Sequence, residues 1–147
     1  MKTLKFLTIV LTALALVPGG AHFFSLPNKI HLTESNYFIV QNIYRGWALF
    51  GIVLFGALFA NLALAWAMRG QRAFAFVLTC VVCLVANLVI FFAFTFPANQ
   101  ATTNWTEVPA DWQQLRWQWE VSHAVNAVIA FAGFCSLAIS FLVEEKH

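Results

Sequence analysis

Four apolar stretches, each long enough to cross a lipid bilayer, constrain this chain more than any other feature. They cover residues 4–24, 46–68, 73–96 and 121–143. A helix rises 1.5 Å per residue, so about 20 residues cross the roughly 30 Å of hydrocarbon in a bilayer. In lipid the backbone has to satisfy its own hydrogen bonds, and separate stretches of this length do so as helices. We therefore expect four transmembrane helices.

The composition fits that expectation and excludes one class of partner. Of the 147 residues, 61% are hydrophobic and 10% are charged, whereas soluble domains carry about 25% charged residues. A chain this apolar lacks the polar side chains to cover its own surface, so a lipid bilayer is its expected surrounding. The net charge of +2 is too small to predict nucleic-acid binding. A single domain, residues 1–147, is the natural division.

The first apolar stretch has a second interpretation. Its basic start, its apolar centre and the letters PGGA resemble a secretory signal that is cleaved after Ala21. Cleavage would leave His22 at the new N-terminus, as a ligand suited to copper. It would also leave three spans, which place the two ends of the chain on opposite sides of the membrane. We expect the first helix to be retained.

Lysine and arginine residues predict the orientation, because cytoplasmic loops carry an excess of them. With the N-terminus inside, the cytoplasmic side carries five: Lys2, Lys5, Arg69, Arg72 and Lys146. The outer side carries three: Lys29, Arg45 and Arg116. We therefore expect a multi-pass protein of the cell membrane with both termini in the cytoplasm.

The two outer loops contain helix signals of their own. In the first loop, Thr33 is a candidate helix start, and the apolar pattern after it runs unbroken into the second span. In the second loop, Asp111 and Gln114 have the spacing of a capping box. The expected fold is all-α: an antiparallel four-helix transmembrane bundle whose second and fourth helices extend into an extracytoplasmic cap.

Some residues inside the spans are expected to serve packing alone. Cys80 and Cys83 form a C-x-x-C pattern, which in a soluble protein indicates redox or zinc chemistry. Here both lie midway along an apolar span, where cysteine packs as a small apolar residue. Small residues such as Gly133 let helices approach closely in a membrane, and Asn61 is expected to form a hydrogen bond between helices.

Polar residues from all four spans are expected at one level near the outer side. Arg116, Glu120 and His123 lie on one face of the last helix. The simplest interpretation is an ion pair between Arg116 and Glu120 beside a belt of interfacial tryptophans. Ionisable residues at membrane depth more often mark a functional site, however. We therefore expect an outward-opening pocket whose substrate-binding residues are His22, Tyr44, Arg45, Asn99, Arg116, Trp119 and Asn126.

Three chemistries fit such a pocket. Glu120 and His123 have the Glu-x-x-His spacing of carboxylate-bridged metal sites, which copper or zinc could use together with His22. Alternatively, a haem could be held between His22 and His123. The interpretation that we favour needs neither metal nor cofactor: His123 acts as a general base, and Glu120 orients it and raises its basicity.

The segments GAHFFSLPNKIHL, YFIVQNIYRGWALFG, FPANQATTNWTEVPADW and LRWQWEVSHAVNA carry a family resemblance. They resemble the anthrone-oxygenase-like family of small four-helix membrane proteins, and residues 96–104 and 115–126 are the most specific parts. The resemblance implies an activity similar to that of cofactor-independent oxygenases, which convert anthrones to anthraquinones. It also implies that the site includes Trp119, Glu120, His123 and Asn126.

The leading hypothesis is a membrane oxygenase-like enzyme for a small lipophilic, aromatic or quinol-like substrate that enters from the outer leaflet. His123 removes a proton, and Arg116, Asn99 or Asn126 stabilises the resulting anion, which then reacts with O₂. Two alternatives stay open. One is a non-catalytic assembly or lipid-binding protein whose charged groups neutralise one another. The other is a metal- or haem-binding protein that uses His22 and His123.

Overall fold

The computed structural model describes residues 1–143, and within them every regular element is a helix. Lys146, which entered the charge count above, lies outside the described residues. Four helices are long: α1 (Lys2–Lys29), α3 (Phe50–Ala67), α4 (Phe74–Ile90) and α6 (Trp112–Leu142). A π-helical turn, η3 (Phe91–Thr95), carries α4 on into α5 (Phe96–Ala101). Four helical segments are thus long and apolar enough to cross a membrane.

The first connection does not run into the second span as expected. A short helix α2 (Glu34–Gln41) is followed by two 3₁₀ turns, η1 (Asn42–Tyr44) and η2 (Trp47–Leu49). Between these turns Gly46 has φ = 85°, a left-handed conformation that glycine adopts without steric cost. The prediction of one unbroken helix was therefore wrong, because the backbone turns at Gly46 before α3 begins.

The start of the last helix is where the sequence predicted it, but its capping is different. Asp111 is the N-cap residue of α6, and its backbone carbonyl accepts hydrogen bonds from the Gln114 and Leu115 amides. The Asp111 side chain forms no capping hydrogen bond. The predicted capping box is therefore wrong, although the helix boundary is right.

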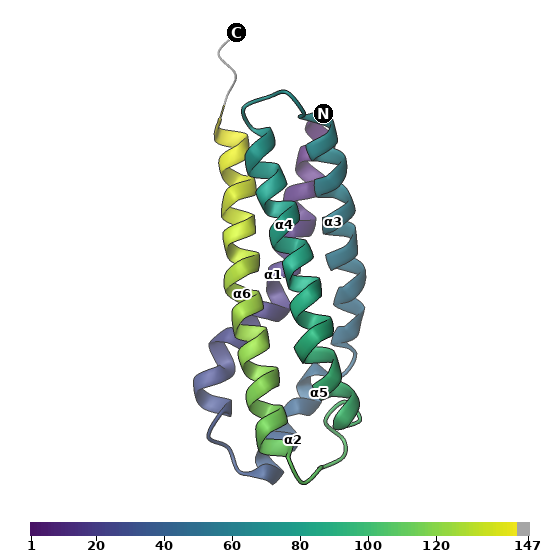
Figure 1. Cartoon of the computed structure of the whole chain (residues 1–147), viewed down its shortest axis with the longest axis vertical. Helices are drawn as coiled ribbons and strands as arrows, with labels where there is room; N and C mark the ends of the chain where they lie inside the picture. The colour runs from purple at the N-terminus through teal and green to yellow at the C-terminus, as the bar shows by residue number, and fades with distance from the viewer. Residues whose placement is uncertain (144–147) are drawn as a thin grey trace.

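The four long helices lie side by side (Figure 1). The start of α1, the turn between α3 and α4 and the end of α6 lie at one end of the molecule, while α2 and α5 lie at the other. In the ring of helices, α1 and α4 each pack against both α3 and α6. Large apolar side chains face outward along the bundle, among them Phe59, Trp66 and Phe131, each more than half exposed. Apolar helices with such surfaces indicate a lipid bilayer environment.

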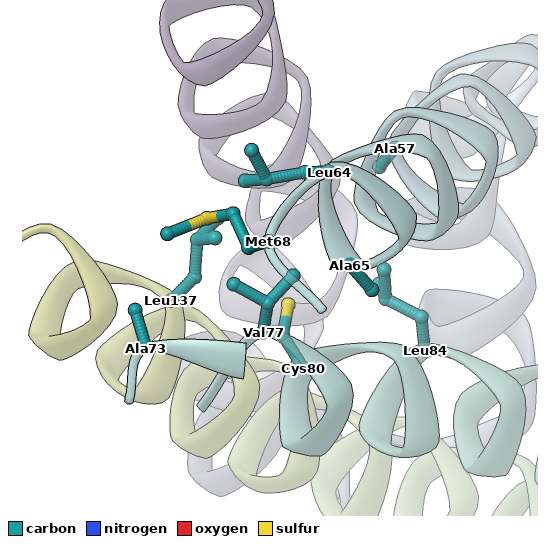
Figure 2. Packing of buried hydrophobic residues seen from close by; sticks show 9 residues of the cluster. All are labelled: Ala57, Leu64, Ala65, Met68, Ala73, Val77, Cys80, Leu84 and Leu137. Carbon is teal, nitrogen blue, oxygen red and sulfur yellow. The ribbon is translucent and has the colours of Figure 1, made fainter. Parts of the chain in front are cut away.

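An apolar core lies in the part of the bundle next to the α3–α4 turn, and Figure 2 shows how its side chains pack. It consists of Ala57, Leu64, Ala65, Met68, Ala73, Val77, Cys80, Leu84 and Leu137. Nearby, α6 and α4 approach so closely that a Cβ added to Gly133 would lie 2.8 Å from the Cβ of Cys83. Cys80 thus packs in the apolar core and Cys83 against α6, where Gly133 permits the close approach.

Some polar side chains inside the bundle form hydrogen bonds between helices. The Asn61 amide on α3 donates to the Thr12 hydroxyl on α1 at 2.9 Å and to the Ala57 carbonyl at 2.8 Å. The Ser136 hydroxyl on α6 donates to the Phe76 carbonyl on α4 at 2.9 Å. Unpaired polar groups are costly in an apolar interior, so these bonds fix how the helices face one another. The interhelical role predicted for Asn61 is confirmed.

Candidate functional site

A cavity of about 750 Å³ occupies the half of the bundle that the apolar core leaves unfilled. Residues of α1, α3, α4 and α6 line it, together with both 3₁₀ turns. Its walls include Leu84 of the core at one end and Trp105 and Trp119 at the other. A cavity of this size is in the range of small-molecule binding sites.

Two histidines from opposite ends of the sequence meet in this cavity. His22 comes from α1 and His123 from α6, and their ring centroids are 4.0 Å apart with 31° between the ring planes. His22 is 4% exposed, and its Nδ1 atom has no hydrogen-bond partner among the described residues. Both side chains line the cavity. The structure therefore brings together the two imidazoles that were expected at one level.

Aromatic rings hold the histidine pair in place. The Tyr44 ring lies 4.1 Å from the His22 ring, and the Trp119 ring lies 4.7 Å from His22 and 4.3 Å from His123. The Trp119 indole donates to Asn99 Oδ1 at 2.8 Å, and the Trp105 indole donates to the same atom at 3.2 Å. Asn99 therefore orients the tryptophans that form this wall of the cavity.

Asn126 supplies a second unpaired polar atom. Its amide nitrogen donates to the Asn87 carbonyl at 3.3 Å, while its Oδ1 atom, in a side chain only 9% exposed, lacks a partner within residues 1–143. Buried polar atoms nearly always have partners, so the exceptions need an explanation. Asn126 and His22 both line the cavity. A ligand with polar atoms at this level would satisfy them.

Glu120 takes a different partner from the one predicted. Its Oε1 atom lies 2.9 Å from Lys29 Nζ and accepts a hydrogen bond of 2.9 Å from the Tyr37 hydroxyl. Arg116 instead donates to the Leu32 carbonyl at 2.8 Å. The predicted ion pair between Arg116 and Glu120 is therefore wrong, because Lys29 on another helix reaches the carboxylate.

Two further expectations for this region are wrong: that Glu120 orients His123, and that Arg116 lines the pocket. In the described part of the chain no hydrogen bond joins Glu120 to His123, so Glu120 does not orient the imidazole. Neither Glu120 nor Arg116 lines the cavity. Arg45 does line it, at an exposed position where its guanidinium donates to Asn42 Oδ1 at 2.9 Å.

Lys29 is the functional candidate that the sequence reasoning missed. It is 3% exposed, and its ammonium lies 4.7 Å from the Tyr44 ring centroid and 5.2 Å from that of Trp119. Both of these rings contact His22. Lys29 follows His22 by seven residues, a spacing that places both on one face of a helix, and that signal was available in the sequence. A buried cation thus lies behind the wall next to the histidines.

Tyr37, on the short helix α2, completes the buried charge network of Lys29 and Glu120. It is fully buried and packs with Trp105 at a centroid distance of 5.2 Å. Burial raises the pKa of the Tyr37 phenol far above its ordinary value, and the neighbouring Glu120 carboxylate raises it further. The phenol therefore stays protonated and donates to Glu120. The buried rings of Tyr37, Trp105 and Trp119 pack with Ala98 into a cluster, called the aromatic cluster below, beside this end of the cavity.

The positions of His22, His123 and Glu120 can be compared with what a metal site or a haem site would need. Within residues 1–143, no three histidine, cysteine, aspartate or glutamate side chains are grouped as a metal site requires. The ring centroids of His22 and His123 are 4.0 Å apart, so a porphyrin between them would require the two rings to separate. The Glu120 carboxylate faces Lys29 and Tyr37, away from a shared site with His123.

Comparisons of the chain with protein-family models, with curated proteins and with solved structures found no match. The cavity and the residues that line it therefore provide the basis for a functional proposal.

Proposed function

We propose that this protein is an oxygenase-like membrane enzyme that oxidises a small lipophilic, aromatic or quinol-like substrate without a cofactor. One observation supports the proposal above all: two imidazoles whose ring centroids are 4.0 Å apart line a cavity of about 750 Å³. Imidazole is the usual general base near neutral pH. The resemblance to the anthrone-oxygenase-like family points to the same chemistry.

In the proposed reaction, His123 takes a proton from an acidic C–H group beside a carbonyl or phenol ring. Two adjacent imidazoles repel each other when both are charged, so the neighbouring His22 favours the neutral form of His123 as the base. The substrate anion gives one electron to O₂, and the two radicals combine to a peroxide. His123 returns its proton to the peroxide, and loss of water leaves a carbonyl, so that one methylene and one O₂ become one carbonyl and one water. A hydroquinone instead loses two hydroxyl protons and two electrons to O₂, which gives a quinone and hydrogen peroxide.

The residues around the histidines have distinct roles in this scheme. Asn126 and the unpaired nitrogen of His22 bind the polar atoms of the substrate. Asn99 acts through the tryptophans that it orients. Lys29 lies behind Tyr44 and Trp119, where its charge is paired with Glu120 and holds that wall of the cavity. Stabilisation of the anion is then left to Asn126, because Arg116 lies outside the cavity wall.

We further propose that the four helices form an antiparallel bundle across the cell membrane, with both termini in the cytoplasm. The aromatic cluster, α2 and α5 then form an extracytoplasmic cap. Of the three outer cations that entered the charge count, Lys29 is buried and paired with Glu120. The remaining excess of lysine and arginine at the α3–α4 turn and the start of α1 supports this orientation.

The test is oxygen consumption by purified protein in lipid nanodiscs, screened with anthrone-type and hydroquinone-type compounds. His123→Ala is expected to lower turnover by about 100-fold or more, the usual contribution of a general base. His31→Ala is the matched control, because His31 is an exposed histidine at the same end of the molecule. Full turnover by a correctly folded His123→Ala protein would show that His123 is not the base.

A second candidate, a ligand-binding protein without catalysis, is favoured by one observation. Lys29 and Glu120 neutralise each other, as expected of charged groups that serve only assembly. The same nanodisc assay distinguishes the two, because a pure binding protein returns its ligand chemically unchanged in the presence of O₂.

A further inference from the structure

We infer that the cavity binds a single-tailed amphipathic molecule, with its polar ring at the histidines and its apolar tail extending toward the core. Only the ring rests on the proposed function, which asks for an aromatic or quinol-like head. The tail is inferred from the shape, the polarity and the opening of the cavity.

The cavity is elongated along the bundle axis. Its lining extends on α1 from Thr12 to His22 and on α6 from Trp119 to Ala130. At 1.5 Å per residue, these ranges correspond to roughly 15 Å on each helix. A compact ring at the histidines would leave the deeper part of this length empty.

The polarity of the cavity changes along its length. The unpaired Nδ1 atom of His22 lies next to the aromatic cluster, and Asn126 lies about one helical turn deeper than His123, beside Asn87. The deep end is lined by apolar side chains, including Leu54, Leu84 and Ala130. Thr12 also lies there, but its hydroxyl already donates to the Thr8 carbonyl and accepts from the Asn61 amide. The deep end thus offers a ligand apolar contacts.

On the side between α3 and α4, residues that line the cavity also reach the outer surface of the bundle. Phe55 of α3 and Phe92 of η3 line the cavity and are also 44% and 55% exposed. Gly51 of α3 also lines the cavity, and a Cβ added there would meet nothing within 4 Å, so no neighbouring side chain packs against that position. The π-helical turn lies at this opening, and such turns are frequent at functional sites. A molecule dissolved in the bilayer would enter sideways and keep its tail in apolar surroundings throughout.

Photo-crosslinking tests this inference without any turnover. The probe is a hydroquinone with one alkyl chain that ends in a diazirine, added to the protein in phosphatidylcholine nanodiscs and illuminated under argon. Labels are expected on the deep lining residues of α1 and α6, Leu16 and Ala130. Labels confined to the outward-facing Val128 and Phe131 would place the tail in lipid and overturn the inference.

Two further measurements make the result specific. Ala130→Phe places a ring in the space that the tail would occupy. Because a packed site accommodates extra volume poorly, deep labelling is expected to fall about tenfold. Ala132→Phe is the matched control on the exposed face of α6 and is expected to leave labelling unchanged. With the unaltered protein, excess tailed hydroquinone is expected to compete and tail-less hydroquinone to compete much less; equal competition would overturn the inference.

The outcome can be separated from that of the proposed function. Deep labelling of a protein that oxidises no substrate would support the tail site and remove the oxygenase. Turnover of tail-less compounds without deep labelling would support the oxygenase and overturn the tail site.

Discussion

Removing the buried ammonium of Lys29 is expected to destabilise the protein strongly. Lys29 Nζ lies 2.9 Å from Glu120 Oε1, and the two side chains are 3% and 0% exposed. At an effective dielectric constant of about 20, charges at that distance attract by about 6 kcal/mol, most of which offsets the cost of removing both from water. Lys29→Met leaves the Glu120 carboxylate with the Tyr37 hydroxyl as its one partner within residues 1–143. Breaking a buried pair in this way costs about 3–5 kcal/mol.

The double variant Lys29→Met with Glu120→Gln separates charge from packing. It leaves no unpaired buried charge, and glutamine can still accept the hydrogen bond from Tyr37, so it is expected to be more stable than either single variant. Reversible unfolding in mixed detergent micelles, followed by circular dichroism, measures all three. Lys2→Met is the control, because Lys2 is exposed at the other end of the bundle. A loss of less than about 1 kcal/mol in Lys29→Met, typical of a surface pair, would refute the buried network.

Two further predictions concern stability. Gly133→Leu is expected to cost about 1–3 kcal/mol, since even its Cβ would lie 2.8 Å from the Cys83 Cβ; Gly20→Leu, where an added Cβ meets nothing within 4 Å, is the control in the same unfolding assay. In a Tyr44→Phe protein, where Tyr37 is the remaining tyrosine, ultraviolet titration is expected to show no phenolate near the ordinary pKa of about 10, because burial raises the pKa of Tyr37. The folded protein then binds more protons than the unfolded chain above pH 10, so its stability is expected to fall as the pH rises past that value; ionisation of the folded protein near pH 10 would contradict the burial.

The parts of the structure that were predictable depend on neighbours in sequence. The four apolar stretches predicted the four long helices because span length is set by bilayer thickness, a property of each segment alone. The helix start at Asp111 and the common level of His22 and His123 follow from similar local counting.

The parts that were missed depend on which helices meet. Spacing within one helix pairs Arg116 with Glu120, yet Lys29 wins because α1 and α6 pack together and bring it to 2.9 Å. The break at Gly46 was missed because an apolar pattern does not reveal a left-handed glycine. A buried lysine is rare, and only its helical register with His22 could have indicated it.

The uneven filling of the bundle has a mechanical consequence. Interdigitated side chains fix the helices near the α3–α4 turn, whereas farther along the same helices enclose empty space. Any widening needed to admit a guest should therefore pivot about the filled end, with the largest displacements at η3 and the start of α3. Hydrogen–deuterium exchange should then be slowest near Leu137 and fastest near Phe92, and a guest should slow exchange mainly at the latter.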